Sequence, residues 1–174
     1  MTDHVILVDT NDREIGTMAK MEAHIEGLLH RAFSVFIFNT KGELLLQRRA
    51  FEKYHSGGKW TNTCCSHPRP GEALMDAAQR RLQEEMGMQA VLRHAFSFTY
   101  QADLLDGLTE NEYDHVFFGV TDQVPAVNPE EVSAYRYVDM QHLSADIDEN
   151  PDDYTAWLKI CFNRVAAQYP QLFL

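Results

Sequence analysis

One segment of the chain combines a helical period with well-defined boundaries, and it predicts a helix over residues 72–86. Apolar residues recur on it at four-residue intervals, namely Leu74, Ala78, Leu82 and Met86. A loop rich in glycine and proline (54–71) precedes the segment, and Gly87 is a typical C-terminal stop. A helix that is apolar on one face must bury that face, so the segment predicts a layered domain.

The rest of the chain alternates between strand-like and helical runs. The β-rich runs are 4–8, 33–38, 43–47, 91–100, 113–120 and 135–138. The second and third of these flank a short glycine-containing loop, which predicts a hairpin, and 154–168 predicts a second helix. The acidic stretch 146–153 is interpreted as a solvated loop that caps this helix. The order of elements predicts an α+β fold with a mixed or antiparallel sheet, in a single domain over 1–174.

Charge and cysteine content exclude several classes of protein. The 15 Lys+Arg against 26 Asp+Glu give a net charge of −11, which argues against nucleic acid or an anionic membrane as the partner. No apolar run approaches the ~20 residues of a spanning helix, and the first residues do not resemble a signal peptide. Three cysteines are not a disulfide framework, so a cytoplasmic protein is expected. An acidic surface is compatible with a monomer, although the oligomeric state stays open.

The predicted helix carries charged residues that have two interpretations. Arg81 and Glu85 are four residues apart and share a face, with Glu84 beside them and Glu72 at the start. Carboxylates beside a loop rich in glycine and proline could hold Mg²⁺ through oxygen ligands. The alternative is a solvated helix with Glu–Arg pairs, and composition alone would favour this alternative.

Two short motifs place further potential ligands on the chain. Cys65 and His67 are two residues apart, and Glu110 and Glu112 repeat that spacing, so each pair shares a side of an extended backbone. Two further imidazoles come from His24 and His30. Three histidines and two glutamates can form a site for Zn²⁺, Mn²⁺ or Fe²⁺. Singly, each histidine is more often structural than a ligand. The sequence assigns no role to Cys64, His55 or His115, and the two histidines are expected to be structural rather than ligands.

The spacing around the predicted helix resembles the Nudix signature. Glu72 is followed after seven residues by Arg80, then by one more residue, the aliphatic Leu82 and the run QEEMGM. The resemblance implies a loop–helix–loop on an α/β/α sandwich. Two positions depart from the family pattern, because Ser66 stands for the first glycine and Arg81 for a metal-binding glutamate. The second departure counts against diphosphate hydrolysis but leaves diphosphate binding plausible.

Nearly the whole chain resembles the type 1 isopentenyl-diphosphate isomerases, which have a Nudix fold. The matching segments are AKMEAH, LLHRAFSVFIFN, LLLQRRA with Lys53, WTNTCCSHPRPGE, the helix with Arg81 and Glu85, FSFTYQA, ENE and Trp157. By matched position, the resemblance implies a transition-metal site of His24, His30, His67, Glu110 and Glu112. It also implies Mg²⁺, bound with the substrate diphosphate by Glu85 and the carbonyl of Cys65.

The same resemblance implies the catalytic and substrate-binding residues. Cys65 and Glu112 correspond to the acid and base, with Tyr100 as a proton relay. The diphosphate is expected to bind Lys20, Arg49, Lys53 and Arg81, and Trp157 to line the pocket. The implied reaction converts isopentenyl diphosphate to dimethylallyl diphosphate through a tertiary carbocation, so water must be excluded. Trp157 could stabilise the cation through its ring face, or it could simply pack in the core.

Chemical reasoning on these residues leaves some points open. Nearby positive charge lowers a thiol pKa, so Cys65 beside basic groups could hold a thiolate. The order in which Cys65 and Glu112 act, and the identity of the transition metal, stay open. Two rival functions remain, a Nudix hydrolase and a non-catalytic Nudix-fold binding protein. Arg81 counts against the first, and the intact thiol and carboxylates count against the second.

Overall fold

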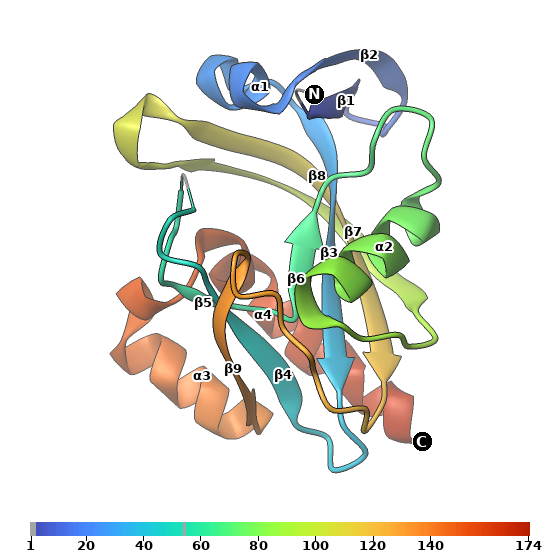
Figure 1. Cartoon of the computed structure of the whole chain (residues 1–174), viewed down its shortest axis with the longest axis vertical. Helices are drawn as coiled ribbons and strands as arrows, with labels where there is room; N and C mark the ends of the chain where they lie inside the picture. The colour runs from blue at the N-terminus through green and yellow to red at the C-terminus, as the bar shows by residue number, and fades with distance from the viewer. Residues whose placement is uncertain (1–2, 54) are drawn as a thin grey trace.

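The computed structural model describes residues 3–53 and 55–174. In this part of the chain, nine strands form one sheet with helices on both faces (Figure 1). The strands are β1 (His4–Val8), β2 (Glu14–Ala19), β3 (His30–Phe38), β4 (Leu44–Arg49), β5 (Trp60–Thr61), β6 (Cys64–Ser66), β7 (Arg93–Asp103), β8 (Thr109–Val120) and β9 (Val132–Val138). The helices are α1 (Lys20–Glu26), α2 (Leu74–Met86), α3 (Met140–Glu149) and α4 (Ala156–Gln168), with 3₁₀ turns at Leu105–Gly107, Pro151–Asp153 and Tyr169–Phe173. No described helix is long and apolar enough to cross a membrane.

Strand β3 is the centre of the sheet. It pairs in parallel with β8 along one edge, and β1, β6 and β4 share its other edge in antiparallel pairings. Residues 32–38 are all buried, which explains why the run FSVFIF is apolar at every position except Ser34 instead of alternating. The parallel β3–β8 pairing among antiparallel neighbours makes the sheet mixed, which is one of the two alternatives that the sequence left open.

Two apolar clusters cover the two faces of the sheet. On one face, Leu82 and Met86 of α2 pack with Phe33 of β3. On the other face, Leu158 and Phe162 of α4 belong to a cluster that includes Phe36, Phe38 and Leu143. These layers form the α/β/α sandwich that the sequence predicted, with α2 on one side of the sheet and α4 on the other (Figure 1).

Contacts at both ends fix the position of helix α2, and those at its start also hold the loop before it. Glu72 accepts hydrogen bonds from Arg80 Nε at 2.7 Å and Nη2 at 2.9 Å, and from the backbone N–H of Arg69 at 2.9 Å. At the C-terminal end, Gly87 adopts φ +61°, and a Cβ there would lie 2.4 Å from the carbonyl oxygen of Ala126. The glycine is therefore required by both the left-handed backbone and the close approach of another segment.

The structure corrects the sequence prediction at several places, because α3 was not predicted and because β5 and β6 lie within the predicted loop 54–71. Residues 14–19 and 20–26 form β2 and α1, which were not predicted; β2 is largely exposed, and α1 has no side-chain cap at Ala19. The acidic stretch 146–153 is not a loop, because its first four residues end α3 and 151–153 form a 3₁₀ turn. Strand β8 begins at Thr109 rather than at Tyr113, so Glu110 and Glu112 lie within the sheet.

Candidate active site

Three carboxylates lie along one face of β8. Glu110, Glu112 and Asp114 occupy alternate positions of the strand, and all three are buried. Glu112 is the register partner of His30 on β3 and of Tyr100 on β7. Because β8 runs between β3 and β7, it brings side chains from distant parts of the sequence into one row.

A set of nitrogen and oxygen donors converges at this end of the sheet. His24 of α1, His30 of β3, His67 after β6 and Glu112 of β8 each offer a ligand atom, and these atoms lie within 4.8 Å of one another. The Nδ1 atoms of His24 and His30 each lie 2.8 Å from a backbone carbonyl oxygen. A ring N–H donated to a carbonyl leaves Nε2 as the metal-binding nitrogen, so the arrangement fits a divalent metal ion.

Glu110 and Glu112 share the hydroxyl of Tyr100. Its oxygen lies 2.7 Å from Glu110 Oε2 and 2.6 Å from Glu112 Oε2, and its single proton is donated to one of them at a time. Burial and the charge of Glu112 raise the pKa of Glu110 well above its usual range. Burial also acts to raise the pKa of Glu112, but hydrogen bonds with His30 and His67 hold it well below its usual range. A cation between these groups would favour ionisation of both carboxyls.

The two adjacent cysteines of β6 lie in different environments. Cys64 is fully buried in the cluster under α2, whereas Cys65 is partly exposed and lines a cavity together with His67 and Glu112. Burial raises the pKa of the Cys65 thiol against the opposing effect of Arg49, and Glu85 and Glu112 add to the increase. These effects favour the neutral thiol over the thiolate that nearby basic residues could stabilise.

Four cationic side chains line the same cavity, namely Lys20, Arg49, Lys53 and Arg81. Burial and the nearby charges of Lys53 and Arg81 lower the pKa of Lys20, although Asp3 opposes the shift. Within the described residues, the Nε atoms of Arg49 and Arg81 are buried without a hydrogen-bond partner. Buried donors without partners are unfavourable, so two of them at one cavity indicate a binding site for an anion.

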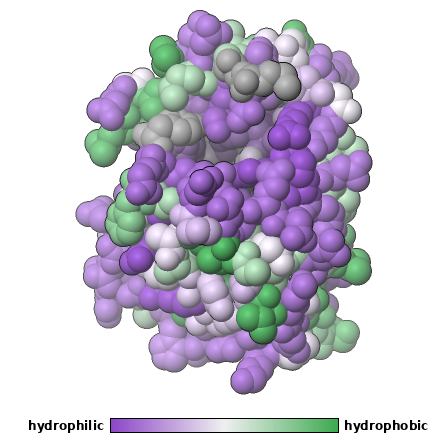
Figure 2. All heavy atoms as spheres, in the orientation of Figure 1, coloured by the Kyte–Doolittle hydropathy of each residue, from purple (hydrophilic) through white to green (hydrophobic). Residues whose placement is uncertain are grey.

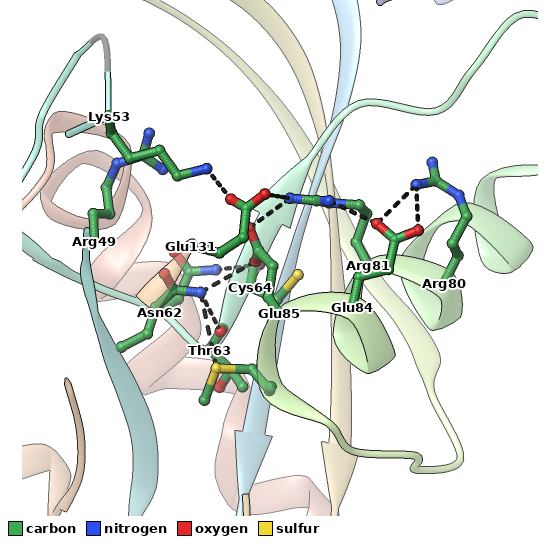
Figure 3. Close-up of polar contacts among 12 residues, drawn as sticks. Arg49, Lys53, Asn62, Thr63, Cys64, Arg80, Arg81, Glu84, Glu85 and Glu131 are labelled. Atoms are coloured by element: carbon green, nitrogen blue, oxygen red, sulfur yellow. Dashed lines mark hydrogen bonds and ion pairs between the residues drawn. The ribbon is translucent and has the colours of Figure 1, made fainter. Parts of the chain in front are cut away.

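Two of these cations contact one carboxylate that sequence reasoning missed. Glu131 forms ion pairs with Lys53 and Arg81, the latter at 3.5 Å between Nη2 and Oε1 (Figure 3). Arg81 also donates to Glu84 at 2.6 Å and to Glu85 at 2.8 Å. Glu131 thus lies where a bound anion would compete for the same donors. Nothing in its local sequence distinguishes it from a surface glutamate of the loop before β9.

Glu85 lies apart from the histidine cluster. It is buried, and its two oxygens accept hydrogen bonds from Arg81 at 2.8 Å and from Gln47 Nε2 at 3.2 Å. Glu85 lines the cavity with Cys65, so an ion bound with a diphosphate could reach it. Its role as a ligand of Mg²⁺ stays a prediction.

Trp157 closes the apolar side of the cavity. Its ring is buried, its Nε1 donates to Asn62 Oδ1 at 3.2 Å, and the guanidinium of Arg49 lies 5.4 Å from the ring centroid. The ring is 3% exposed and also lines the cavity from α4, so it both packs in the core and faces the site. Hydrophilic side chains gather around the hollow in the upper half of the face in Figure 2.

Two more residues of the site were not assigned by the sequence. Asp114 continues the alternation of Glu110 and Glu112, and that period was a signal that could have identified it. His55 has its Nε2 3.3 Å from Glu110 Oε1, and it forms a second potential metal-binding group with His24 and Glu110. His115 instead contacts Asp12 at 2.8 Å, outside the cavity, in agreement with the structural role expected of it.

Comparisons with known proteins agree with this architecture. A model of the NUDIX domain matches residues 28–158. A structure from Deinococcus radiodurans superimposes with a TM-score of 0.78 at 19% identity, covering 93% of this chain and 98% of that one. A MutT protein from Methanosarcina mazei gives a TM-score of 0.67 at 21% identity, with 80% and 94% covered. At these identities, the likeness establishes the fold alone.

Sequence relatives are considerably closer. An isopentenyl-diphosphate Delta-isomerase from Pectobacterium atrosepticum is 53% identical over 92% of this chain and 90% of its own length. Isopentenyl-diphosphate Delta-isomerase 1 of Aromatoleum aromaticum is 54% identical, with 96% and 94% covered. A family match over most of the chain and such relatives lead to one conclusion: the chain belongs to the isopentenyl-diphosphate Delta-isomerases, a family with the Nudix fold.

Proposed function

We propose that this chain converts isopentenyl diphosphate to dimethylallyl diphosphate in isoprenoid biosynthesis, with Cys65 and Glu112 as the proton-transferring groups. The membership of the isomerase family supports the reaction. The observation that carries the assignment of residues is one cavity lined by a thiol, a buried carboxylate pair and four cations. A proton donor, a proton acceptor and an anion-binding region are the three components that this reaction requires.

The reaction moves one double bond without a net change in composition. A proton is added to the terminal methylene carbon, and the π electrons form the new C–H bond, leaving the positive charge on the tertiary carbon. A proton then leaves the neighbouring methylene carbon, and its bonding pair forms the new double bond. The neutral thiol of Cys65 is suited to donate or return a proton, and Glu112 is suited to act on the other side. Tyr100 connects Glu112 to Glu110 and can relay that proton.

The diphosphate is held away from the reacting carbons by Lys20, Arg49, Lys53 and Arg81. The buried Nε donors of Arg49 and Arg81 support this role, because a guanidinium can bind a phosphate through two donors. Glu85, with the Cys65 carbonyl, is proposed to bind Mg²⁺ with the diphosphate. Arg81 replaces a carboxylate of the hydrolase pattern, so no group at this position recruits the ions that activate water for attack on phosphorus.

A divalent transition metal is proposed at the site of His24, His30, His67, Glu110 and Glu112. Manganese, zinc and iron all suit this donor set. When bound, the metal supplies positive charge that keeps the buried carboxylates ionised. The indole of Trp157 supplies an aromatic face to the developing cation, worth about 2 kcal/mol when desolvated, and its burial excludes water from that wall.

A product assay distinguishes this function from its rivals. The purified protein is incubated with isopentenyl diphosphate and Mg²⁺, and the mixture is analysed for dimethylallyl diphosphate and for free phosphate. The isomerase is expected to give the first and none of the second, and the Cys65→Ala variant is expected to give neither. Release of phosphate would indicate a hydrolase, and an unchanged substrate with metal-loaded protein would leave only a binding function.

A further inference from the structure

We infer that His55 is an additional protein ligand of the transition metal and that it closes the coordination position that water would otherwise occupy. This inference rests on the metal site of the proposed function, which the sequence restricted to three histidines and two glutamates. His55 lies in the loop between β4 and β5, and its side chain is only 7% exposed. The loop therefore directs this imidazole inward, toward the carboxylates of β8.

The distances from His55 to the metal-site residues suit a shared ion. Its Nε2 lies 3.3 Å from Glu110 Oε1, and the ligand atoms of His55, His24 and Glu110 lie within 4.8 Å of one another. Donors about 2.1 Å from one ion lie about 3.0 Å apart when adjacent and about 4.2 Å apart when opposite. The observed separations thus allow coordination with small side-chain movements.

Glu110 and Glu112 each direct one carboxylate oxygen toward Tyr100 and the other toward histidines. In both Glu110 and Glu112, Oε2 contacts the hydroxyl of Tyr100. The Oε1 atom of Glu112 faces His30 at 3.4 Å and His67 at 2.9 Å, and the Oε1 atom of Glu110 faces His55. His24 belongs to both groups of potential ligands. The two groups of potential ligands are therefore joined through His24, and an octahedral site could use all six donors.

A sixth protein ligand has a consequence for the proposed reaction. A metal site with an open position holds a water molecule there, and water quenches a tertiary carbocation. His55 also lies beside the aromatic wall, with its ring centroid 6.0 Å from that of Trp157. The side chain would thus exclude water from both the metal and the adjacent pocket.

The same loop connects the metal to the diphosphate-binding region. Lys53 lies two residues before His55, and Arg49 Nη2 donates to the carbonyl oxygen of His55 at 3.4 Å. Coordination of His55 would therefore fix the backbone that positions these two cations. His55 combines two effects, because it completes the coordination shell and orders the anion-binding loop.

Water-proton relaxation of the Mn²⁺-loaded enzyme tests the inference without a measurement of activity. The wild type is expected to show no metal-bound water, and His55→Ala is expected to gain about one. Manganese affinity, measured by chelator competition, is expected to fall at least about tenfold in His55→Ala. The control is His142→Ala, whose side chain is 84% exposed, and it should behave as the wild type. An unchanged water count in His55→Ala would overturn the inference even if affinity falls, because His55 would then only orient Glu110.

His67→Ala separates failure of this inference from failure of the proposed site. If His67→Ala loses its manganese while His55→Ala matches the wild type, the five-residue site stands and the inference falls. If His67→Ala retains manganese, both fall together. X-ray absorption of the zinc-loaded wild type provides a measurement that does not depend on folding of a variant. Four imidazoles around the ion are expected, and three would overturn the inference.

Discussion

Alanine substitutions of the three cysteines should separate an effect on stability from an effect on catalysis. Cys64 is 0% exposed in the cluster beneath α2, Cys161 is 3% exposed in α4, and Cys65 lines the active-site cavity. Replacing a fully buried Cys64 with alanine removes one packed atom and leaves a small cavity, at a cost of about 1–2 kcal/mol. Replacing Cys65 removes an atom that faces the cavity, so its cost should stay within about 0.5 kcal/mol.

The stability difference converts to a measurable shift in melting temperature. A chain of 174 residues has an unfolding entropy of about 0.37 kcal/mol per kelvin near its midpoint. Cys64→Ala should therefore melt about 3–5 °C below the wild type, and Cys65→Ala within about 1–2 °C of it. Conversely, loss of a general acid or base lowers kcat by about 10²–10⁴-fold, and this loss is expected for Cys65→Ala alone.

Scanning calorimetry and a product assay with isopentenyl diphosphate test the two effects on the same preparations. Cys161→Ala is the matched control, since it also removes a buried thiol but lies outside the cavity. It should lose stability like Cys64→Ala and retain activity. The reasoning would be refuted if Cys64→Ala were inactive while Cys65→Ala retained its activity, because the register of β6 would then be wrong.

Four other perturbations test separate parts of the structure. His24→Ala and His67→Ala should each lose most of the bound transition metal by elemental analysis, whereas His94→Ala should keep it; full metal in both site variants would contradict the ligand assignment. Arg81→Ala should weaken substrate binding by about 1.5–3 kcal/mol, seen as a raised KM without loss of transition metal, and unchanged kinetics would reduce Arg81 to a surface ion pair. Glu131→Gln should lower KM by about 2–5-fold with kcat unchanged, because a carboxylate that competes for Lys53 and Arg81 is neutralised; a raised KM would show that Glu131 positions these cations. Gly87→Ala should lower the free energy of unfolding by more than about 2 kcal/mol in urea titrations. The control is Gly71→Ala, where a Cβ meets nothing within 4 Å, and it should lower that free energy by only about 1 kcal/mol. Equal losses in the two variants would contradict the clash with Ala126.

Local periodicity determined the elements that bury one face. The four-residue spacing of Leu74 to Met86 predicted α2, and the apolar run of 33–38 predicted the central strand. The two-residue period of an extended backbone placed Glu110 with Glu112, and Cys65 with His67, on one side of the chain. It failed for β2, which lies mostly exposed at the sheet edge and so shows no apolar alternation. It also failed for α3, of which only Met140 and Leu143 are buried.

The family resemblance supplied the full set of candidate ligands, but the sequence alone could not place them together. His24 lies on α1, His30 on β3 and His67 after β6. Their convergence depends on the parallel pairing of β3 with β8 and on β6 along the other edge of β3. Nor could a local pattern identify Glu131 or His55, because both lie in loops whose backbone is positioned by distant strands.

The balance of effects on the Cys65 thiol likewise depends on the tertiary structure. Basic residues near the thiol could stabilise a thiolate, but burial and the carboxylates of α2 and β8 raise its pKa. Periodic patterns record which face of an element is buried, since burial selects apolar residues along one element. Side-chain convergence and ionisation depend on the distances and solvent access that arise only when several elements pack together.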